Sequence, residues 1–285
     1  MVYITEVGPR DGLQNEKKII SVDEKVAFIN ALSHSGVHEI EVTSFVSPKW
    51  VPQFQDAVEV CQRIERLDGV SYSALVPNAK GFDRALEAGV DRIAIFSATS
   101  ETFSQKNTNG SVREVLRRYN DFIPRSLSAH IPVRGYISTV FACPYEGKTD
   151  AQKTLELALE LLDLGCDFIA LGDTLGQATG PEVRELLDIL VPALGTETLV
   201  MHFHDTHGEA ANNVRISVDY GIKRFDASVG GLGGCPYAGP GAVGNVSTQK
   251  IIDVLREKGE KPGVDENRLR KAEAVIQQAL QNQED

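Results

Sequence analysis

The sequence predicts a (β/α)8 TIM barrel with an extra C-terminal helix, and three observations carry that prediction. A glycine, an apolar residue and two polar positions lead into an alternating apolar strand four times, starting at Gly36, Gly89, Gly165 and Gly221. Four further strand candidates lie between these units, and amphipathic segments separate them. Eight strands alternating with helices over 285 residues are typical of a closed parallel barrel. A doubly wound open sheet is disfavoured, because no G-x-G-x-x-G follows the first strand.

The strands are expected in chain order, each justified by alternation of apolar and polar residues or by the glycine that precedes it. In the four repeats a helix-like segment ends at the glycine, which accepts the left-handed conformation at the C′ position. The eight strand-bearing segments are 3–7, 36–42, 70–76, 89–95, 133–140, 165–171, 198–204 and 221–227.

The clearest helix is expected over 154–164, with Thr149 or Asp150 as its N-cap. Its apolar face is expected to carry three leucines: Leu155, Leu159 and Leu162.

No linker, low-complexity block or charge run marks a domain boundary. We therefore expect residues 1–285 to form one domain, with the barrel over about 1–258 and the extra helix over about 265–281. That helix is amphipathic and should pack on the barrel or on a partner through Leu269, Ala272, Val275, Ile276 and Ala279.

The charge balance narrows the classes of partner. Lys and Arg number 29 against 40 Asp and Glu, which gives a net charge of -11. A general nucleic-acid surface or an anionic membrane surface is therefore not expected, although a local basic pocket for an anionic substrate is compatible with this charge. No apolar run is long enough to span a membrane.

Cysteine usage indicates a reducing compartment. Cys61, Cys143, Cys166 and Cys235 form no C-x-x-C pair and no zinc-ribbon spacing. The chain begins directly with an expected strand, which leaves no place for a signal or transit peptide. A cytoplasmic location is the expectation.

Candidate metal ligands gather where a barrel has its active site, at the C-terminal ends of the strands. His202 and His204 share one face of their strand; a single histidine there would more often be a core residue, but two favour a metal. With Asp11, whose alternative role is a helix or turn cap, and an amide oxygen of Asn245, they form a mixed oxygen and nitrogen set. Such a set suits Mg²⁺ or Mn²⁺, with Fe²⁺ and Zn²⁺ as alternatives.

The other candidate residues each have a structural alternative. Arg10 can be a plain ion-pair partner, Glu41 can form a bridge with it, and Asp173 can cap the helix that follows. Cys235 lies in a run with seven glycines between Gly230 and Gly244, so the usual fate of a free cysteine, burial as a small hydrophobe, is disfavoured. Asp205 and His207 are the residues expected to orient the histidine ligands.

Three motifs carry a family resemblance. Residues 6–16 read EVGPRDGLQNE, residues 43–52 read TSFVSPKWVP, and residues 231–237 read GLGGCPY. Together they closely resemble the 3-hydroxy-3-methylglutaryl-CoA (HMG-CoA) lyase family, and the similarity runs from the first strand to about Asn245. The His-x-His and Arg-Asp elements alone are shared with a wider group of barrels that includes isopropylmalate and homocitrate synthases.

The resemblance implies a retro-Claisen cleavage of HMG-CoA, an acyl-CoA, to acetoacetate and acetyl-CoA, and a homodimer. It implies that Asp11, His202, His204 and Asn245 bind the metal. It also implies that Arg10 stabilises the thioester enolate, that Cys235 supports proton transfer, and that three further polar residues serve the active site: Gln14, Glu41 and Asp173.

Departures from the family pattern leave alternatives open. The segment from Cys235 to Asn245 is one residue longer than the family pattern, Gln249 stands at an acidic position, and His207 stands where tyrosine or arginine is commoner. A lyase acting on a related branched 3-hydroxyacyl-CoA is therefore one alternative. A Claisen-type synthase with a 2-oxo acid acceptor and an inactive metal-binding scaffold are the other two.

Overall fold

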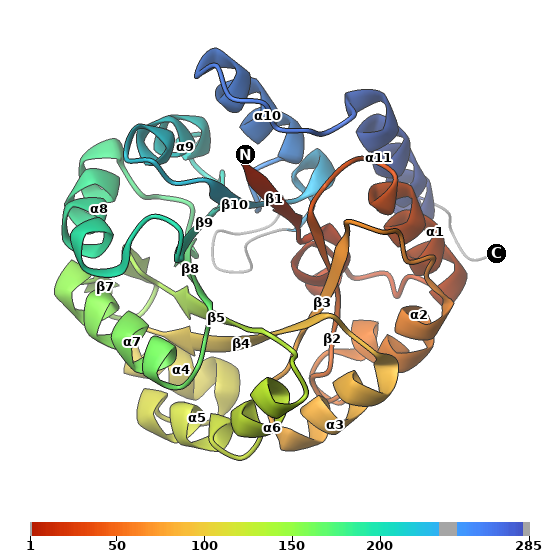
Figure 1. Ribbon diagram of the computed structural model, residues 1–285, viewed down its shortest axis with the longest axis horizontal. Helices are drawn as coiled ribbons and strands as arrows, with labels where there is room; N and C mark the ends of the chain where they lie inside the picture. The colour runs from red at the N-terminus through yellow and green to blue at the C-terminus, as the bar shows by residue number, and fades with distance from the viewer. Residues whose placement is uncertain (1, 234–243, 282–285) are drawn as a thin grey trace.

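The computed structural model, which describes residues 2–233 and 244–281, is a closed barrel of eight parallel strands surrounded by helices (Figure 1). All eight expected strands are present, with ends shifted by a few residues, so the barrel prediction is confirmed. In the order around the barrel they are β1 (Tyr3–Glu6), β2 (Glu39–Ser44), β3 (Ser71–Leu75), β4 (Arg92–Ala98), β5 (Val133–Ser138), β8 (Phe168–Asp173), β9 (Leu199–Phe203) and β10 (Arg224–Ala227).

The repeated glycines turn the chain from a helix or turn into the next strand, as the sequence predicts. Gly36, Gly89, Gly165 and Gly221 have φ values of 86°, 68°, 107° and 88°, in the region that residues with a Cβ rarely adopt. The repeat therefore has a conformational cause: each copy ends one segment and directs the chain back along the barrel.

Helices cover the outside of the barrel, and short turns lie at strand ends. A hairpin of β6 (Ala142–Cys143) and β7 (Gly147–Lys148) follows β5, and a 3-10 turn, η2 (Pro52–Phe54), precedes α2. The helices are α1 (Val22–Ser33), α2 (Ala57–Arg63), α3 (Ala79–Ala88), α4 (Glu101–Thr108), α5 (Val112–Tyr119), α6 (Ile123–Ser128), α7 (Ala151–Asp163), α8 (Gly180–Leu194), α9 (Ala210–Asp219), α10 (Thr248–Glu257) and α11 (Glu266–Gln281).

The helix expected over 154–164 is α7, and its N-cap is Asp150, whose side chain accepts a hydrogen bond from the backbone of Gln152. Its expected apolar face was wrong, because Leu159 is exposed. The buried stripe is the adjacent one, formed by Thr154, Leu157, Ala158 and Leu161. Leucines occur on both stripes, and the stripe with the small Ala158 lets the helix approach the strands closely.

The expected C-terminal helix is α11, which packs along α1 at the edge of the barrel (Figure 1). Its buried residues are Leu269, Ala272, Ile276 and Ala279, while Val275 is partly buried. Packing on the barrel itself, one of the two expected alternatives, is therefore confirmed.

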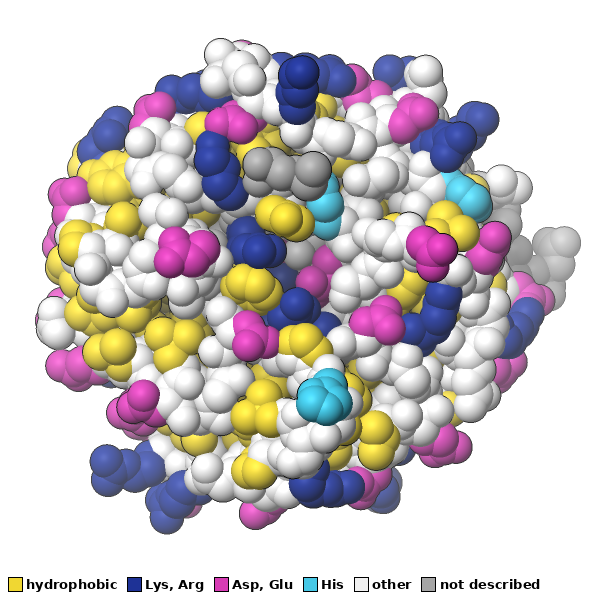
Figure 2. All heavy atoms as spheres, in the orientation of Figure 1, with side chains coloured by type: hydrophobic (Ala, Val, Ile, Leu, Met, Phe, Trp, Pro, Cys, Tyr) yellow, Lys and Arg dark blue, Asp and Glu magenta, His cyan; other side chains and the backbone are white. Residues whose placement is uncertain are grey.

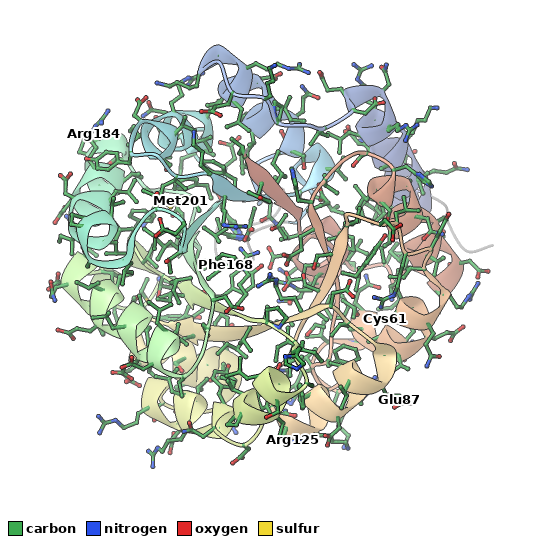
Figure 3. All side chains as sticks on the ribbon, viewed as in Figure 1. Cys61, Glu87, Arg125, Phe168, Arg184 and Met201 are labelled. Carbon is green, nitrogen blue, oxygen red and sulfur yellow. The ribbon has the colours of Figure 1, made fainter. Side chains whose placement is uncertain are left out.

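The main hydrophobic core lies between the strands and the helices, and a second, smaller cluster occupies the opposite faces of the strands. This cluster contains Ala94, Tyr136, Ala170 and Val200, with Phe168 packed against it. Figure 3 shows Phe168 towards the barrel centre. The small side chains leave room inside the barrel for charged groups that are also buried: Arg10, Glu41, Arg134, His202 and Asp226.

On the outside, Glu87, Arg125 and Arg184 point away from the barrel (Figure 3). Basic and acidic side chains intermix over the face of the molecule in view in Figure 2. Within residues 2–233 and 244–281, no helix combines the length and apolar character needed to cross a membrane.

Candidate active site and metal centre

A single π-helical turn, η1 (Gly8–Gly12), follows β1 and carries Arg10 and Asp11. The Val7 carbonyl oxygen accepts hydrogen bonds from the backbone N–H groups of Arg10, Asp11 and Gly12 at 3.1, 2.8 and 3.1 Å. Turns of this kind are frequent at functional sites. The Asp11 carboxylate does not cap a helix; it contacts the side chains of Arg10 and Asn245.

The two histidines face each other, as the alternation along the strand predicts. His202 lies in β9 and His204 directly after it, and their Nε2 atoms are 3.3 Å apart. Burial and the neighbouring His202 lower the pKa of His204 to about 4. Its imidazole is therefore neutral at pH 7 and has a lone pair available for a ligand.

Asn245 returns to this site through backbone pairing with the end of β9. An antiparallel bridge joins His204 to Asn245, and the Asp205 N–H donates to the Gly244 carbonyl at 2.7 Å. The Asn245 amide nitrogen donates to Asp11 Oδ2 at 2.8 Å and to the Leu232 carbonyl at 3.2 Å. The carbonyl end of that amide is the part that a cation binds.

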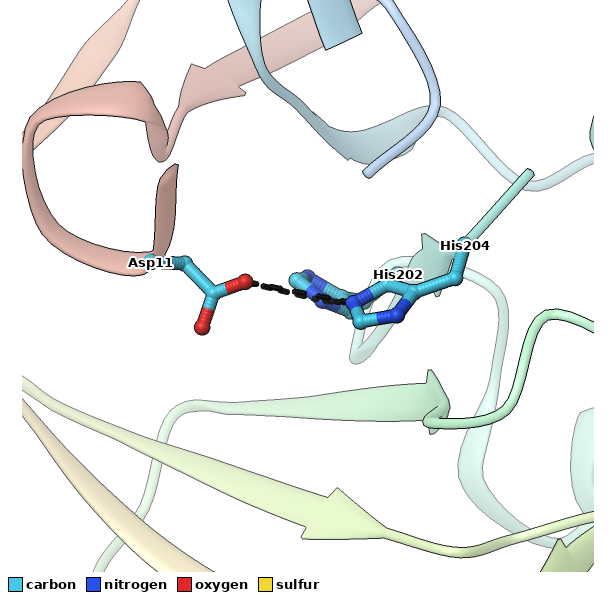
Figure 4. A group of neighbouring side chains, drawn as sticks. All are labelled: Asp11, His202 and His204. Carbon is cyan, nitrogen blue, oxygen red and sulfur yellow. Dashed lines mark hydrogen bonds and ion pairs between the residues drawn. The ribbon is translucent and has the colours of Figure 1, made fainter. Parts of the chain in front are cut away.

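Asp11, His202 and His204 form a group that can hold a metal ion, since one ligand atom from each lies within 4.8 Å of the others (Figure 4). Although burial opposes it, Arg10 and the two imidazoles hold the pKa of Asp11 well below its usual range. Asp11 Oδ2 is 4.0 Å from His202 Nε2 and 3.9 Å from His204 Nε2. These gaps are too long for hydrogen bonds, and a shared cation suits them.

Arg10 is a buried cation that its neighbours hold in one orientation. Its Nε donates to Glu41 Oε2 at 2.6 Å, and its guanidinium lies 5.3 Å from the centre of the Tyr136 ring. The Tyr136 hydroxyl donates to the same Glu41 oxygen at 3.1 Å. Burial disfavours the charged form, yet Glu41 and Asp11 more than offset this and raise the pKa of Arg10. Arg10 thus presents a fixed positive charge beside the metal-binding group.

Asp226, on β10, orients His202, and the sequence analysis missed it. Its Oδ2 lies 3.0 Å from His202 Nδ1 and also pairs with Arg134. Burial raises its pKa, but Arg134 and His202 more than offset this and the net shift is downward. Asp226 therefore leaves Nε2 of His202 to face Asp11.

A sequence signal for these missed groups existed. Asp226 is a charged residue in an otherwise apolar strand, and Tyr136 lies two residues after Arg134, on the same face of β5.

The residues expected to orient the histidines do something else. Asp205 accepts from the Ala210 N–H at 3.1 Å and pairs with Lys250, so it organises the start of α9. His207 is exposed. That expectation was wrong, because orientation of His202 comes from the neighbouring strand rather than from residues close in sequence.

The remaining candidates differ in position. Asp173 is buried at the end of β8 and accepts from the backbone N–H groups of Gln177 at 3.3 Å and Ala178 at 3.1 Å. Burial raises its pKa to about 6. Gln14 is partly buried and follows η1, whereas Cys235 lies outside the described residues. Cys143 is buried and bonds to Ser100 Oγ at 3.0 Å, which agrees with its expected structural role.

Comparison with known proteins gives concordant matches. The HMGL-like family model matches residues 1–276. The Gallus gallus protein named hydroxymethylglutaryl-CoA lyase, mitochondrial, is 45% identical over 279 residues, covering 98% of this chain and 93% of that protein. A Pseudomonas aeruginosa protein named 3-hydroxy-3-isohexenylglutaryl-CoA/hydroxy-methylglutaryl-CoA lyase is 46% identical over 268 residues, covering 94% and 89% of the two chains.

A solved structure agrees with these matches. The crystal structure of the HMG-CoA lyase from Brucella melitensis superposes with a TM-score of 0.96 at 45% sequence identity, covering 99% of both chains. The similarity therefore includes the whole barrel and the C-terminal helix.

Proposed function

The chain belongs to the HMGL-like family, and on that premise we propose that it is a metal-dependent carbon–carbon lyase that cleaves HMG-CoA to acetoacetate and acetyl-CoA. One observation carries this proposal. Asp11, His202 and His204 converge beside the buried Arg10, in a chain 45% identical to a named HMG-CoA lyase over nearly its whole length.

Asp11, His202, His204 and Asn245 would hold the divalent cation. Their oxygen and nitrogen donors, with no thiolate among the described members, favour Mg²⁺ or Mn²⁺. When bound, such a cation supplies Lewis acidity that orients the substrate oxygens and makes the tertiary hydroxyl easier to deprotonate.

The remaining chemistry falls to side chains of the chain. The tertiary hydroxyl loses its proton, the bond between C3 and the thioester α-carbon breaks, and its electron pair moves into the thioester as an enolate. Arg10 stabilises that enolate with a positive charge that Glu41 and Tyr136 hold in place. The enolate carbon then takes a proton, which we assign to Cys235, since a thiol of pKa about 8.5 can deliver it.

Gln14 and Asp173 are proposed to contact the substrate. Asp173 keeps a fixed place at the end of β8 because backbone N–H groups of the following turn bind it. Gln14 follows the turn that carries Arg10 and Asp11. Both therefore lie on segments that end at the same mouth of the barrel.

A second substrate has a specific observation in its favour. The Pseudomonas aeruginosa relative, 46% identical to this chain, is named for both an isohexenyl-substituted and a methyl-substituted glutaryl-CoA. A related branched 3-hydroxyacyl-CoA is therefore the alternative substrate, with the same bonds made and broken.

We also propose that the protein is a single-domain homodimer and that it is cytoplasmic. The homodimer rests on the family to which the chain belongs. The cytoplasmic location rests on the cysteine pattern, since the Gallus gallus relative is named mitochondrial. Sedimentation and cell fractionation test these two assignments.

The deciding experiment follows acetoacetate release from HMG-CoA with Mg²⁺ or Mn²⁺, with and without EDTA, and measures circular dichroism in parallel. We expect release that requires the metal, while the helical signal survives EDTA. Metal-independent release would contradict the proposed role of the cation. A folded protein that binds Mn²⁺ but cleaves only the isohexenyl substrate would instead support the second candidate.

A further inference from the structure

Glu6, the last residue of β1, is a fully buried carboxylate that the proposed chemistry does not use. Its surroundings are polar by construction rather than by chance. Its Oε1 accepts hydrogen bonds from the backbone N–H groups of Gly8 at 3.0 Å and Val229 at 2.9 Å. Its Oε2 accepts from the Thr248 hydroxyl at 2.6 Å.

These three donors belong to three separate segments. Gly8 begins η1, the turn that carries Arg10 and Asp11. Val229 begins η3 (Val229–Gly231), a short turn at the start of the glycine-rich loop, defined here as residues 230–244. Thr248 begins α10, after the loop returns. A single carboxylate thus joins the metal-binding turn to both ends of the glycine-rich loop.

The start of that loop touches the metal-binding group. Gly233, with φ of 111°, lies so close that an added Cβ would be 2.8 Å from the Asn245 amide nitrogen and 3.0 Å from Gly12 Cα. The Asn245 amide also donates to the Leu232 carbonyl at 3.2 Å. A displacement of residues 229–233 would therefore move Asn245 against Asp11.

On its other side η3 has little to hold it. A cavity of about 240 Å³ lies between Val229, Gly230 and the helices α10 and α11. Glu273 of α11 approaches Gly230 there, at 3.0 Å from where a Cβ would stand. Since the outer side is partly open, the hydrogen bonds to Glu6 on the inner side are the contacts that define the height of η3 above the barrel.

We propose that Glu6 is a positioning residue that sets the base of the glycine-rich loop against the turn carrying Arg10 and Asp11. Its effect on turnover rests on the proposed lyase function, whereas its effect on the loop does not. Glutamine is a poor replacement, because its amide nitrogen cannot accept from the Thr248 hydroxyl while its oxygen serves the two backbone donors. Aspartate is shorter by one methylene and cannot reach all three donors.

The test compares Glu6→Gln and Thr248→Val with Thr248→Ser, which keeps the hydroxyl. We expect Glu6→Gln and Thr248→Val to lower kcat for HMG-CoA about 10- to 100-fold with little change in KM, because a misplaced site costs this much. Thr248→Ser should restore kcat. The matched control is Asp56→Asn, which breaks a buried pair with Lys25 away from the site.

A second readout needs no substrate. Cys61, Cys143 and Cys166 are buried, so alkylation of the folded protein by iodoacetamide, located by mass spectrometry, reports Cys235. We expect faster alkylation of Cys235 in Glu6→Gln and Thr248→Val, and the wild-type rate in Asp56→Asn.

Folded Glu6→Gln and Thr248→Val proteins with wild-type alkylation rates would overturn the proposal. So would an equal loss of kcat in Asp56→Asn, since that would indicate general destabilisation. Should Glu6→Gln fail to fold, Thr248→Val, which removes one hydrogen bond of three, still decides. A shifted alkylation rate in a protein inactive on HMG-CoA would support the positioning role and contradict the proposed function.

Discussion

The protonation states of a few buried side chains control the chemistry of this barrel. Arg10 and two imidazoles keep Asp11 ionised, and burial keeps His204 neutral. Each of these states is the one a cation requires of its ligand. The surrounding charges have therefore prepared the site for a metal before any ion binds.

We expect His204→Ala to weaken Mn²⁺ binding about 100-fold or more, since loss of a ligand should cost at least as much as loss of the residue that orients one. Isothermal titration calorimetry measures this. His207→Ala is the matched control: His207 is exposed three residues away and should leave the affinity unchanged. Equal affinities for His204→Ala and wild type would remove His204 from the ligand set.

Asp226→Asn is expected to lower Mn²⁺ affinity about 10- to 100-fold, because the orientation and tautomer of His202 are no longer imposed. It also leaves Arg134 buried without its partner, at a cost of about 3–5 kcal/mol in stability. Metal titration and urea denaturation separate the two effects. Asp205→Asn, which alters a carboxylate paired with Lys250, should leave metal affinity intact; a loss equal to that of Asp226→Asn would count against a specific role for Asp226.

At the scale of elements, strand ends and the turns after them present the site, and the helices support these turns. β8 ends in Asp173, which binds the backbone of residues 177 and 178 and so shapes the turn before α8. Gln249 of α10 donates to Glu266 of α11 at 3.0 Å and lies beside the cavity at η3. Its departure from the family pattern therefore affects the support of the loop rather than the Asp11 group.

The turn after β8 should give stability a particular pH dependence. The folded-state pKa of Asp173, about 6, exceeds its ordinary value of 3.8, so the folded protein holds this proton more tightly than the unfolded chain. The resulting contribution is fully present below pH 3.8 and is lost as pH rises to 6, up to about 3 kcal/mol. We expect the stability of wild type relative to Asp173→Asn to fall between pH 4 and pH 7. A difference that is constant or grows with pH would contradict this reading.

At the scale of the whole molecule, closure of the barrel places β1 beside β10 and β10 beside β9. That adjacency brings Asp11, Asp226 and the histidines together, although hundreds of residues separate β1 from β9. The register sets Asp226 opposite His202 across the neighbouring strands. The C-terminal helix then covers α1 and flanks the base of the glycine-rich loop.

Removing buried bulk from α11 should therefore weaken the whole molecule. Ile276→Ala, at a position 2% exposed, is expected to cost about 2–5 kcal/mol. Leu159→Ala on α7, 44% exposed, should change stability by about 0.5 kcal/mol or less. Denaturant midpoints compare the two, and equal effects would show that α11 is not part of the cooperative core.

Local patterns in the sequence determined the architecture and part of the site. The glycine that ends a helix, the alternation along each strand and the shared face of His202 and His204 depend on residues within a few positions of one another. Interactions of that range can be predicted from sequence, and these predictions were confirmed.

Only the tertiary structure decided the rest. Which stripe of α7 is buried depends on how closely Ala158 lets the helix approach the barrel. That Asp226 rather than Asp205 orients His202, and that Glu6 meets Val229 and Thr248, depends on how β1, β9 and β10 pair as the barrel closes. Sequence spacing does not encode such contacts, because parallel strands that lie side by side are joined through long crossovers and their register is set by packing.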